Sequence, residues 1–300
     1  MALKDIKTKI KATERMHKVT RAMEAVSAVK MRKTQQSAFA GRPYARAALS
    51  ILARLSGSIA NHPLSTVREV KKTALVVMTS DKGLAGALNS SVLRAAAEAV
   101  ANFNKSDVIV YAYGKKAEDY FRRREYTVAE AFENKRDDVP LSDMERLSAD
   151  LSSGFLRGEF DEVVAVYSNF KSTFEQLPTA RRVLPLSVEA LAHLVSDIQP
   201  VKGKWSESKA IEAPSAYEVE PSADEILGIL VPKLVAVSLY HMLLESKASE
   251  HSARMVAMKN ASDKSKDVVR DLTRVFNKVR QAAITREVSE IVGGREALSA

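Results

Sequence analysis

The chain has 300 residues, of which 46% are hydrophobic, enough to bury a core in one large domain or two ordinary ones. Its formal net charge of +9 at pH 7 indicates an acidic partner: nucleic acid, an anionic lipid or an acidic protein surface. The absence of cysteine excludes a disulfide framework, a thiolate zinc site and a cysteine nucleophile, and it fits a reducing compartment.

The N-terminal segment predicts a long amphipathic helix. Its first residues, MALKDIKTKIKATERMHK, are charged throughout and do not resemble a secretory signal. No glycine or proline occurs before Gly41, and helical spacing relates the stripe Leu3, Ile6, Ile10 and Thr13, then Met16, Val19, Met23 and Val26. We expect the helix to break or kink at Gly41 and Pro43 and to end near Gly57, which gives a first helical domain over residues 1–57.

The next part of the chain predicts an α/β domain over residues 72–205. Four short β-branched segments bounded by turn residues predict strands at 73–81, 107–114, 162–168 and 181–187. Helical spacing between them, in LNSSVLRAAAEAVANF and SDMERLSADLSSGFL, gives a strand–helix–strand order. Residues 206–222 are polar and contain proline, so we expect a linker with at most one edge strand at YEVE.

Residues 223–300 predict a second long helix. No glycine or proline lies between Pro232 and Gly293, and about 60 helical residues would extend ~90 Å, well beyond a small domain. Spacings of four and three relate Leu244, Ala248, His251, Met255, Met258, Ser262, Ser265, Val269, Leu272, Phe276, Val279 and Ala283, which is the pattern of a coiled coil. The simplest partner is the first helix, so the fold predicted is an antiparallel coiled coil of the N- and C-terminal helices with an inserted Rossmann-like α/β domain, a stalk with a head.

The end of this helix, NKVRQAAITREVSEIVGG, is apolar on nearly every side. A helix of that kind has to be enclosed. No window of the chain approaches the ~18 uninterrupted apolar residues of a membrane span, so the sequence predicts no segment that crosses a membrane.

The sequence does not predict catalysis by this chain. The turn TSDKGLAGALNSS follows a strand and opens a helix, where a phosphate loop would lie, but it matches neither G-x-G-x-x-G nor G-x-x-x-x-G-K-S/T. Glycines that permit a tight turn are one interpretation and a nucleotide site is the other. The histidines show no metal-ligand spacing, and no nucleophile elbow or identifiable carboxylate pair is present.

The first helix carries far more basic than acidic residues, which allows two interpretations. One is a solvated helix face, and the other is a basic coiled coil that binds nucleic acid. The helix lacks the interleaved aromatic residues of single-strand binders.

Four motifs in order resemble the gamma subunit of the rotary (F-type) ATP synthase: TRAMEAVSAVKMRK, TSDKGLAGALNSS, LLESKASEHSARMVAMKNASD and NKVRQAAITREVSEIVGG. The resemblance implies a non-catalytic central rotor shaft of a proton-translocating synthase, on the cytoplasmic face of the bacterial inner membrane. It also implies alpha and beta subunits, an epsilon subunit and the membrane c ring as partners, with Mg-ATP or Mg-ADP bound only by those partners and no cofactor on this chain.

The resemblance also implies specific contacts. Arg21, Met23, Lys30 and Arg32 match shaft positions that meet an acidic loop of the beta subunits. Arg280, Gln281 and Thr285 match residues that engage another beta loop. The tip residues Ile284, Val288, Ile291 and Val292 correspond to a bearing surface inside the alpha–beta hexamer.

Overall fold

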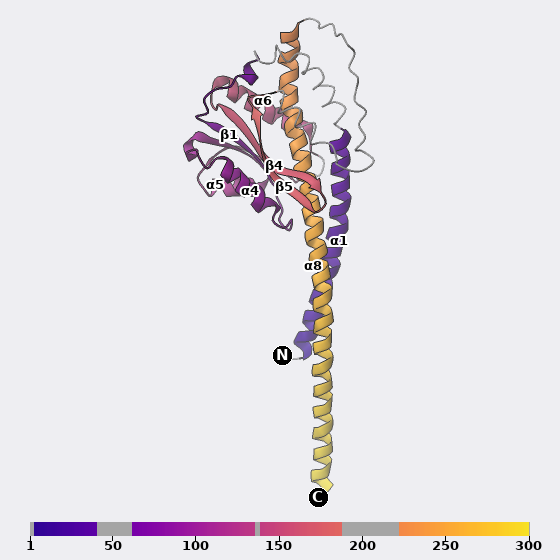
Figure 1. The fold of residues 1–300 in the computed structure, drawn as a ribbon. Helices are drawn as coiled ribbons and strands as arrows, with labels where there is room; N and C mark the ends of the chain where they lie inside the picture. The colour runs from indigo at the N-terminus through magenta and orange to yellow at the C-terminus, as the bar shows by residue number, and fades with distance from the viewer. Residues whose placement is uncertain (1–2, 41–61, 136–138, 188–221, 300) are drawn as a thin grey trace. The chain divides into compact units, whose positions relative to one another are not determined.

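A computed structural model describes residues 3–40, 62–135, 139–187 and 222–299 (Figure 1). The expected helix end near Gly57, the YEVE strand and most of the expected linker lie outside these residues. The chain divides into two compact units, residues 1–27 with 255–300 and residues 28–254. Helices α1 (Leu3–Ala40) and α8 (Ala223–Ser299) each contribute to both units.

The unit of residues 28–254 is built on a five-stranded sheet in the order β3-β2-β1-β4-β5. The first four strands are parallel and β5 is antiparallel to β4. The strands are β1 (Thr73–Met78), β2 (Val108–Tyr113), β3 (Thr127–Phe132), β4 (Glu162–Ser172) and β5 (Glu175–Leu184).

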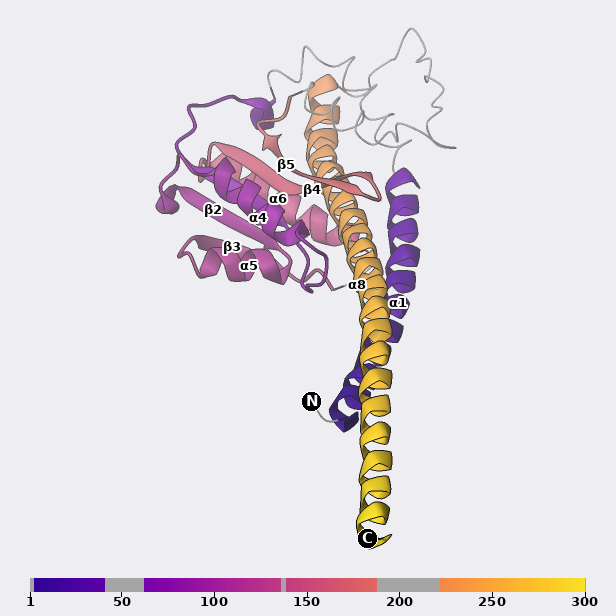
Figure 2. The ribbon, with the colours of Figure 1, turned by 60° about the horizontal axis from the view of Figure 1, so that its bottom comes forward.

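Alternate residues of the central strand β1 pack into two separate cores. Leu75 and Val77 lie in a core with α4 (Leu88–Ala99) and α5 (Lys115–Arg122). Val76 and Met78 lie in a core with α6 (Leu141–Arg157) and the first part of α8. Helices therefore cover both faces of the sheet (Figure 2). Two short 3-10 helices, η1 (Pro63–Ser65) and η2 (Lys105–Asp107), complete the described elements.

The structure corrects the strand predictions in several places, since β1 ends at Met78 rather than at residue 81 and β4 extends to Ser172 rather than to residue 168. Strand β3 and helix α5 were not predicted. The sequence of β3, TVAEAF, is a weak strand signal, because it contains two alanines and alternates exposed with partly buried residues at a sheet edge. Strand β5 begins at Glu175 rather than at residue 181, and it includes Pro178. An edge strand tolerates proline because its outer side needs no N–H donor.

Helix α8 runs without interruption through Gly228, Pro232 and the Gly293–Gly294 pair. Within residues 225–295 it contains an 18-residue window long and apolar enough to cross a membrane by length and composition, and 56% of that window is buried in the protein. Its most apolar residues, such as Leu234, Val235 and Leu239, lie in the core against the sheet. The apolarity of this segment is thus accounted for by packing.

In the unit of residues 1–27 and 255–300, α1 and α8 lie side by side and antiparallel (Figures 1 and 2). The predicted seam of α8 is confirmed within this unit, because every residue in it from Met255 to Ala283 is buried or half-buried, whereas Leu244, Ala248 and His251 are buried in the other unit. The predicted stripe of α1 is confirmed as far as Thr13 and again at Met23, which is half-buried. Met16, Val19 and Val26 are 57%, 54% and 53% exposed.

The buried stripe of α1 instead continues in strict spacings of four and three. After Thr13 it passes through His17, Thr20, Glu24 and Ser27, all buried or half-buried. The Thr20 hydroxyl is satisfied within its own helix, since Oγ1 lies 3.0 Å from the Met16 carbonyl and 3.1 Å from the His17 carbonyl. A polar residue can therefore occupy the seam, and the apolar residues beside it remain exposed.

Candidate partner-binding surfaces

The last turns of α8 form an apolar surface that no described part of the chain covers. From Ile284 to Arg295 every residue is exposed, whereas Val279 and Ala283 just before are half-buried. The exposed fractions are 51% for Ile284, 53% for Val288, 71% for Ile291 and 50% for Val292. A contiguous group of such side chains indicates an interaction site.

Polar residues predicted to contact a partner adjoin this surface. Arg280, Gln281 and Thr285 are all exposed. Spacings of three and four place Arg280 on one face with Ile284, and Gln281 on the neighbouring face with Thr285. Arg286 forms an ion pair with Glu290 at 2.8 Å, whereas no ion pair to Arg280 occurs among the described residues. The Arg280 guanidinium is available for a partner carboxylate.

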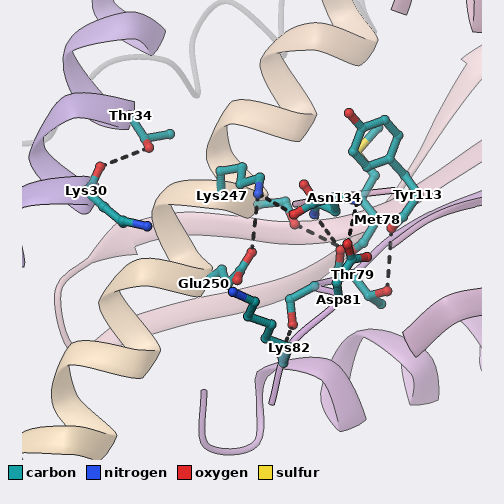
Figure 3. A network of polar contacts seen from close by, with 12 residues as sticks. Lys30, Thr34, Met78, Thr79, Asp81, Lys82, Tyr113, Asn134, Lys247 and Glu250 are labelled. Atoms are coloured by element: carbon teal, nitrogen blue, oxygen red, sulfur yellow. Dashed lines mark hydrogen bonds and ion pairs between the residues drawn. The ribbon is translucent and has the colours of Figure 1, made fainter. Parts of the chain in front are cut away.

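Helix α1 presents a second surface that mixes basic and apolar side chains. Arg21 and Arg32 are exposed, and Met23 and Lys30 are half-buried. The Lys30 carbonyl accepts a hydrogen bond from the Thr34 hydroxyl at 3.0 Å (Figure 3). The exposed apolar side chains of the same helix are Met16, Val19, Val26 and Val29, the last 68% exposed.

The exposed apolar residues of α1 were missed as candidate contacts. Met16, Val19 and Val26 were predicted to share one stripe with Leu3, Ile6 and Ile10, and Val29 was not part of that prediction. The strict spacing of four and three through His17 and Thr20 is the signal that could have assigned them to the outer side of the helix.

The polar groups of the turn after β1 are bonded within the domain. Asp81 Oδ1 accepts the Lys115 N–H at 2.7 Å, and Oδ2 accepts the Asn134 N–H at 3.0 Å. The Ser80 N–H donates to Asn89 Oδ1 at 3.0 Å. Figure 3 shows Asp81 and Asn134 together at this edge of the sheet. The contacts favour a structural role for the motif over a phosphate site.

A metal site does not emerge from the described residues either. Among them, no group of three or more histidine, cysteine, aspartate or glutamate side chains is arranged to hold a metal ion.

Comparison with known proteins shows which family the chain belongs to. A family model described as ATP synthase matches residues 2–298. The ATP synthase gamma chain of Roseiflexus castenholzii is 41% identical over 304 residues, covering 99% of this chain and 98% of the relative. The chain belongs to the ATP synthase gamma chain family. The gamma chain of Pelotomaculum thermopropionicum is 37% identical over 300 residues, covering 99% of each chain.

Solved structures agree with the fold. The central stalk and c-ring structure of the Tetrahymena thermophila mitochondrial ATP synthase contains a chain 25% identical, with a TM-score of 0.59, covering 81% of this chain and 99% of that one. A rotor chain of the Euglena gracilis mitochondrial enzyme is 15% identical with a TM-score of 0.60, covering 94% of this chain and 98% of that one.

These findings confirm the resemblance predicted from the four motifs and the predicted fold class. Nothing in them favours the nucleic-acid alternative. The individual contact residues on α1 and α8 stay predictions.

Proposed function

We propose that this gamma chain is the central rotor shaft of a proton-translocating ATP synthase, and that it couples rotation of the membrane ring to conformational change in an alpha–beta hexamer. The observation that carries the proposal is the exposed apolar end of α8, from Ile284 to Val292, which extends a helix of the gamma chain family past its buried seam. A sleeve of other subunits would enclose it. The Tetrahymena structure contains a central stalk together with a c ring.

Rotation is coupled to conformational change because the shaft is asymmetric within the ring of subunits around it. A single shaft inside a three-fold ring meets each beta subunit with a different side, so it favours a different conformation in each of them. A contact shifts an equilibrium only by its differential free energy between two states. The residues proposed to supply such a difference are Arg280 and Gln281, since the guanidinium of Arg280 can make two-pronged bonds to a carboxylate at a restricted angle.

The energetics require a continuous shaft. One proton that moves through ~100 mV supplies about 2.3 kcal/mol. Several protons must therefore contribute to the synthesis of each ATP. A long helix that twists elastically can store the free energy that they supply. Helix α8 is continuous from Ala223 to Ser299.

The remaining partners and the chemistry follow from this role. The chain itself is non-catalytic and holds no cofactor, and Mg-ATP or Mg-ADP binds on partner subunits. The proposed partners are alpha, beta and epsilon subunits and the c ring, and the complex lies peripherally at the cytoplasmic face of the bacterial inner membrane. The basic residues of α1, including Arg21 and Arg32, then meet acidic beta-subunit loops.

The test is purification of the chain at its native level. We expect co-elution with alpha and beta subunits in a particle that hydrolyses ATP. Isolation of the chain without them, bound instead to nucleic acid with an affinity that falls steeply with salt, would favour the alternative function.

A further inference from the structure

Helix α8 contacts the α/β domain in two chemically different ways. Its first part packs apolar side chains, from Leu227 to Leu244, into the core on one face of the sheet. The following residues, 246–254, are called here the polar segment of α8. In this segment the buried side chains are largely serine, lysine and glutamate.

Three serines of the polar segment donate to carbonyl groups of the domain. Ser246 Oγ lies 3.4 Å from the Met78 carbonyl at the end of β1. Ser249 Oγ lies 3.0 Å from the Ser168 carbonyl in β4. Ser252 Oγ lies 2.7 Å from the carbonyl of Thr173, in the turn between β4 and β5.

These serines form one buried row. They are spaced three residues apart, so they share one face of the helix. Their exposed fractions are 3% for Ser246 and 0% for Ser249 and Ser252. Three parts of the domain are therefore bonded to a single helix face.

Lys247 adds a buried charge to this contact. It is 2% exposed, and its Nζ lies 2.8 Å from the Asn134 carbonyl and 3.9 Å from Glu250 Oε2 (Figure 3). Asn134 is itself held in place, because its side-chain amide donates to the Thr79 carbonyl at 2.6 Å. Glu250, 6% exposed, also pairs with Arg254 at 2.8 Å.

A buried ammonium is an expensive way to hold a helix in place. Burying a charge costs free energy unless it is paired and hydrogen-bonded, and an apolar residue at this position would often stabilise the fold as well or better. What a hydrogen bond adds is direction, since it weakens steeply when donor and acceptor are misaligned. Apolar contacts are non-directional and oppose rotation of the helix about its axis less specifically.

We propose that Ser246, Lys247, Ser249 and Ser252 fix the rotational angle of α8 against the sheet, with Lys247 as the main positioning residue, so that torque passes between the α/β domain and the shaft without slip. This inference rests on the proposed rotor function. It assigns to the polar segment a mechanical role distinct from that of the partner-binding surfaces.

The test compares two lysine variants of the complete complex in proteoliposomes. Lys247→Met removes the charge and keeps an unbranched side chain, and Lys264→Met changes an exposed lysine of the same helix. ATP hydrolysis is measured with an uncoupler, when the rotor works against no load, and the steady-state proton gradient is measured without it. A merely structural role would not separate these two quantities.

We expect Lys247→Met to hydrolyse ATP normally without load but to sustain a smaller gradient, because loss of a charged hydrogen bond raises the rate of slip about tenfold or more. Lys264→Met should sustain the normal gradient. A normal gradient in Lys247→Met, or a proportional fall in unloaded hydrolysis and gradient, would overturn the inference.

If the complex with Lys247→Met fails to assemble, a second variant tests the same inference. The double change Ser249→Ala and Ser252→Ala removes only two hydroxyl groups and should also lower the gradient without lowering unloaded hydrolysis. An unchanged gradient in this variant counts equally against the inference. Failure of the proposed function is distinguishable, because the unmodified complex would then contain no copy of this chain.

Discussion

The Nδ1 atom of His17 lies 3.0 Å from both the hydroxyl oxygen and the carbonyl oxygen of Ser262, and this contact joins α1 to α8 across 245 residues of sequence. Both residues lie in the seam, where Ser262 is only 4% exposed. Since the contact pairs one position of α1 with one position of α8, it helps to set the register of the antiparallel helices.

His17→Ala should therefore lower the free energy of unfolding by about 1 kcal/mol, the usual net value of one hydrogen bond. Urea unfolding followed by circular dichroism measures the change. The matched control is Lys18→Ala at the neighbouring exposed position. Equal effects of the two substitutions would show that the seam contact contributes nothing specific.

Gly114 should be the most sensitive glycine of the α/β domain. It has φ +101°, and a Cβ added there would lie 2.1 Å from the Thr79 carbonyl oxygen. Gly86 also has positive φ, +57°, but an added Cβ would meet nothing within 4 Å. We expect Gly86→Ala to cost ~1–2 kcal/mol and Gly114→Ala more than ~3 kcal/mol, measured by thermal unfolding. Equal losses would argue against the clash.

Asp161 should make stability depend on pH in the acidic range. Burial alone would raise the pKa of its carboxyl group, but the N–H groups of Lys71 and Lys72 donate to it, and with nearby positive charge they lower the pKa below the ordinary value. A lowered folded-state pKa contributes stability that is complete above the unfolded-state pKa of about 4 and is lost as pH falls through the folded value.

Asp161→Asn should accordingly be less stable than the unmodified chain at pH 7, with the deficit shrinking below about pH 3. Urea midpoints at the two pH values measure it, with exposed Asp263→Asn as the control. A deficit of the same size at both pH values would mean that the carboxylate charge is not the cause.

The parts of the fold that could be predicted from the sequence are those set by local spacing. The seam of α8 follows from apolar and small residues such as Met258 and Leu272 at intervals of four and three. The seam of α1 beyond Thr13 cannot be found from apolar residues, because His17 and Thr20 replace them, and only the strict spacing of four and three marks it.

Contacts between residues far apart in the chain could not be predicted from the sequence either. Burial of Lys247 depends on the Asn134 carbonyl, which is 113 residues away in the chain. Strand β3 depends on β2 beside it rather than on its own weak pattern. The tip residues of α8 could be singled out because a helix apolar on every side is unusual, but what they contact depends on other chains.

Replacing Arg280 and Gln281 together by leucine should reduce turnover and coupling of the assembled complex while assembly survives. Leucine is an equally good helix former, and loss of ~1.5–3 kcal/mol for a charged hydrogen bond changes a rate about tenfold or more. Proton-driven ATP synthesis in membrane vesicles measures the effect. The matched control replaces exposed Lys264 and Lys266 by leucine. Normal synthesis in the Arg280→Leu, Gln281→Leu variant would show that both residues are plain shaft surface.

The rotor role is tested most directly by observing rotation. The chain has no cysteine, so a single cysteine introduced at an exposed position of the α/β domain, such as Lys116, attaches a bead at one site while the alpha–beta hexamer is fixed to glass. We expect ATP to drive the bead in one direction, with a pause for each beta subunit in every turn. A bead that stays fixed or only diffuses while the same particles hydrolyse ATP would contradict it.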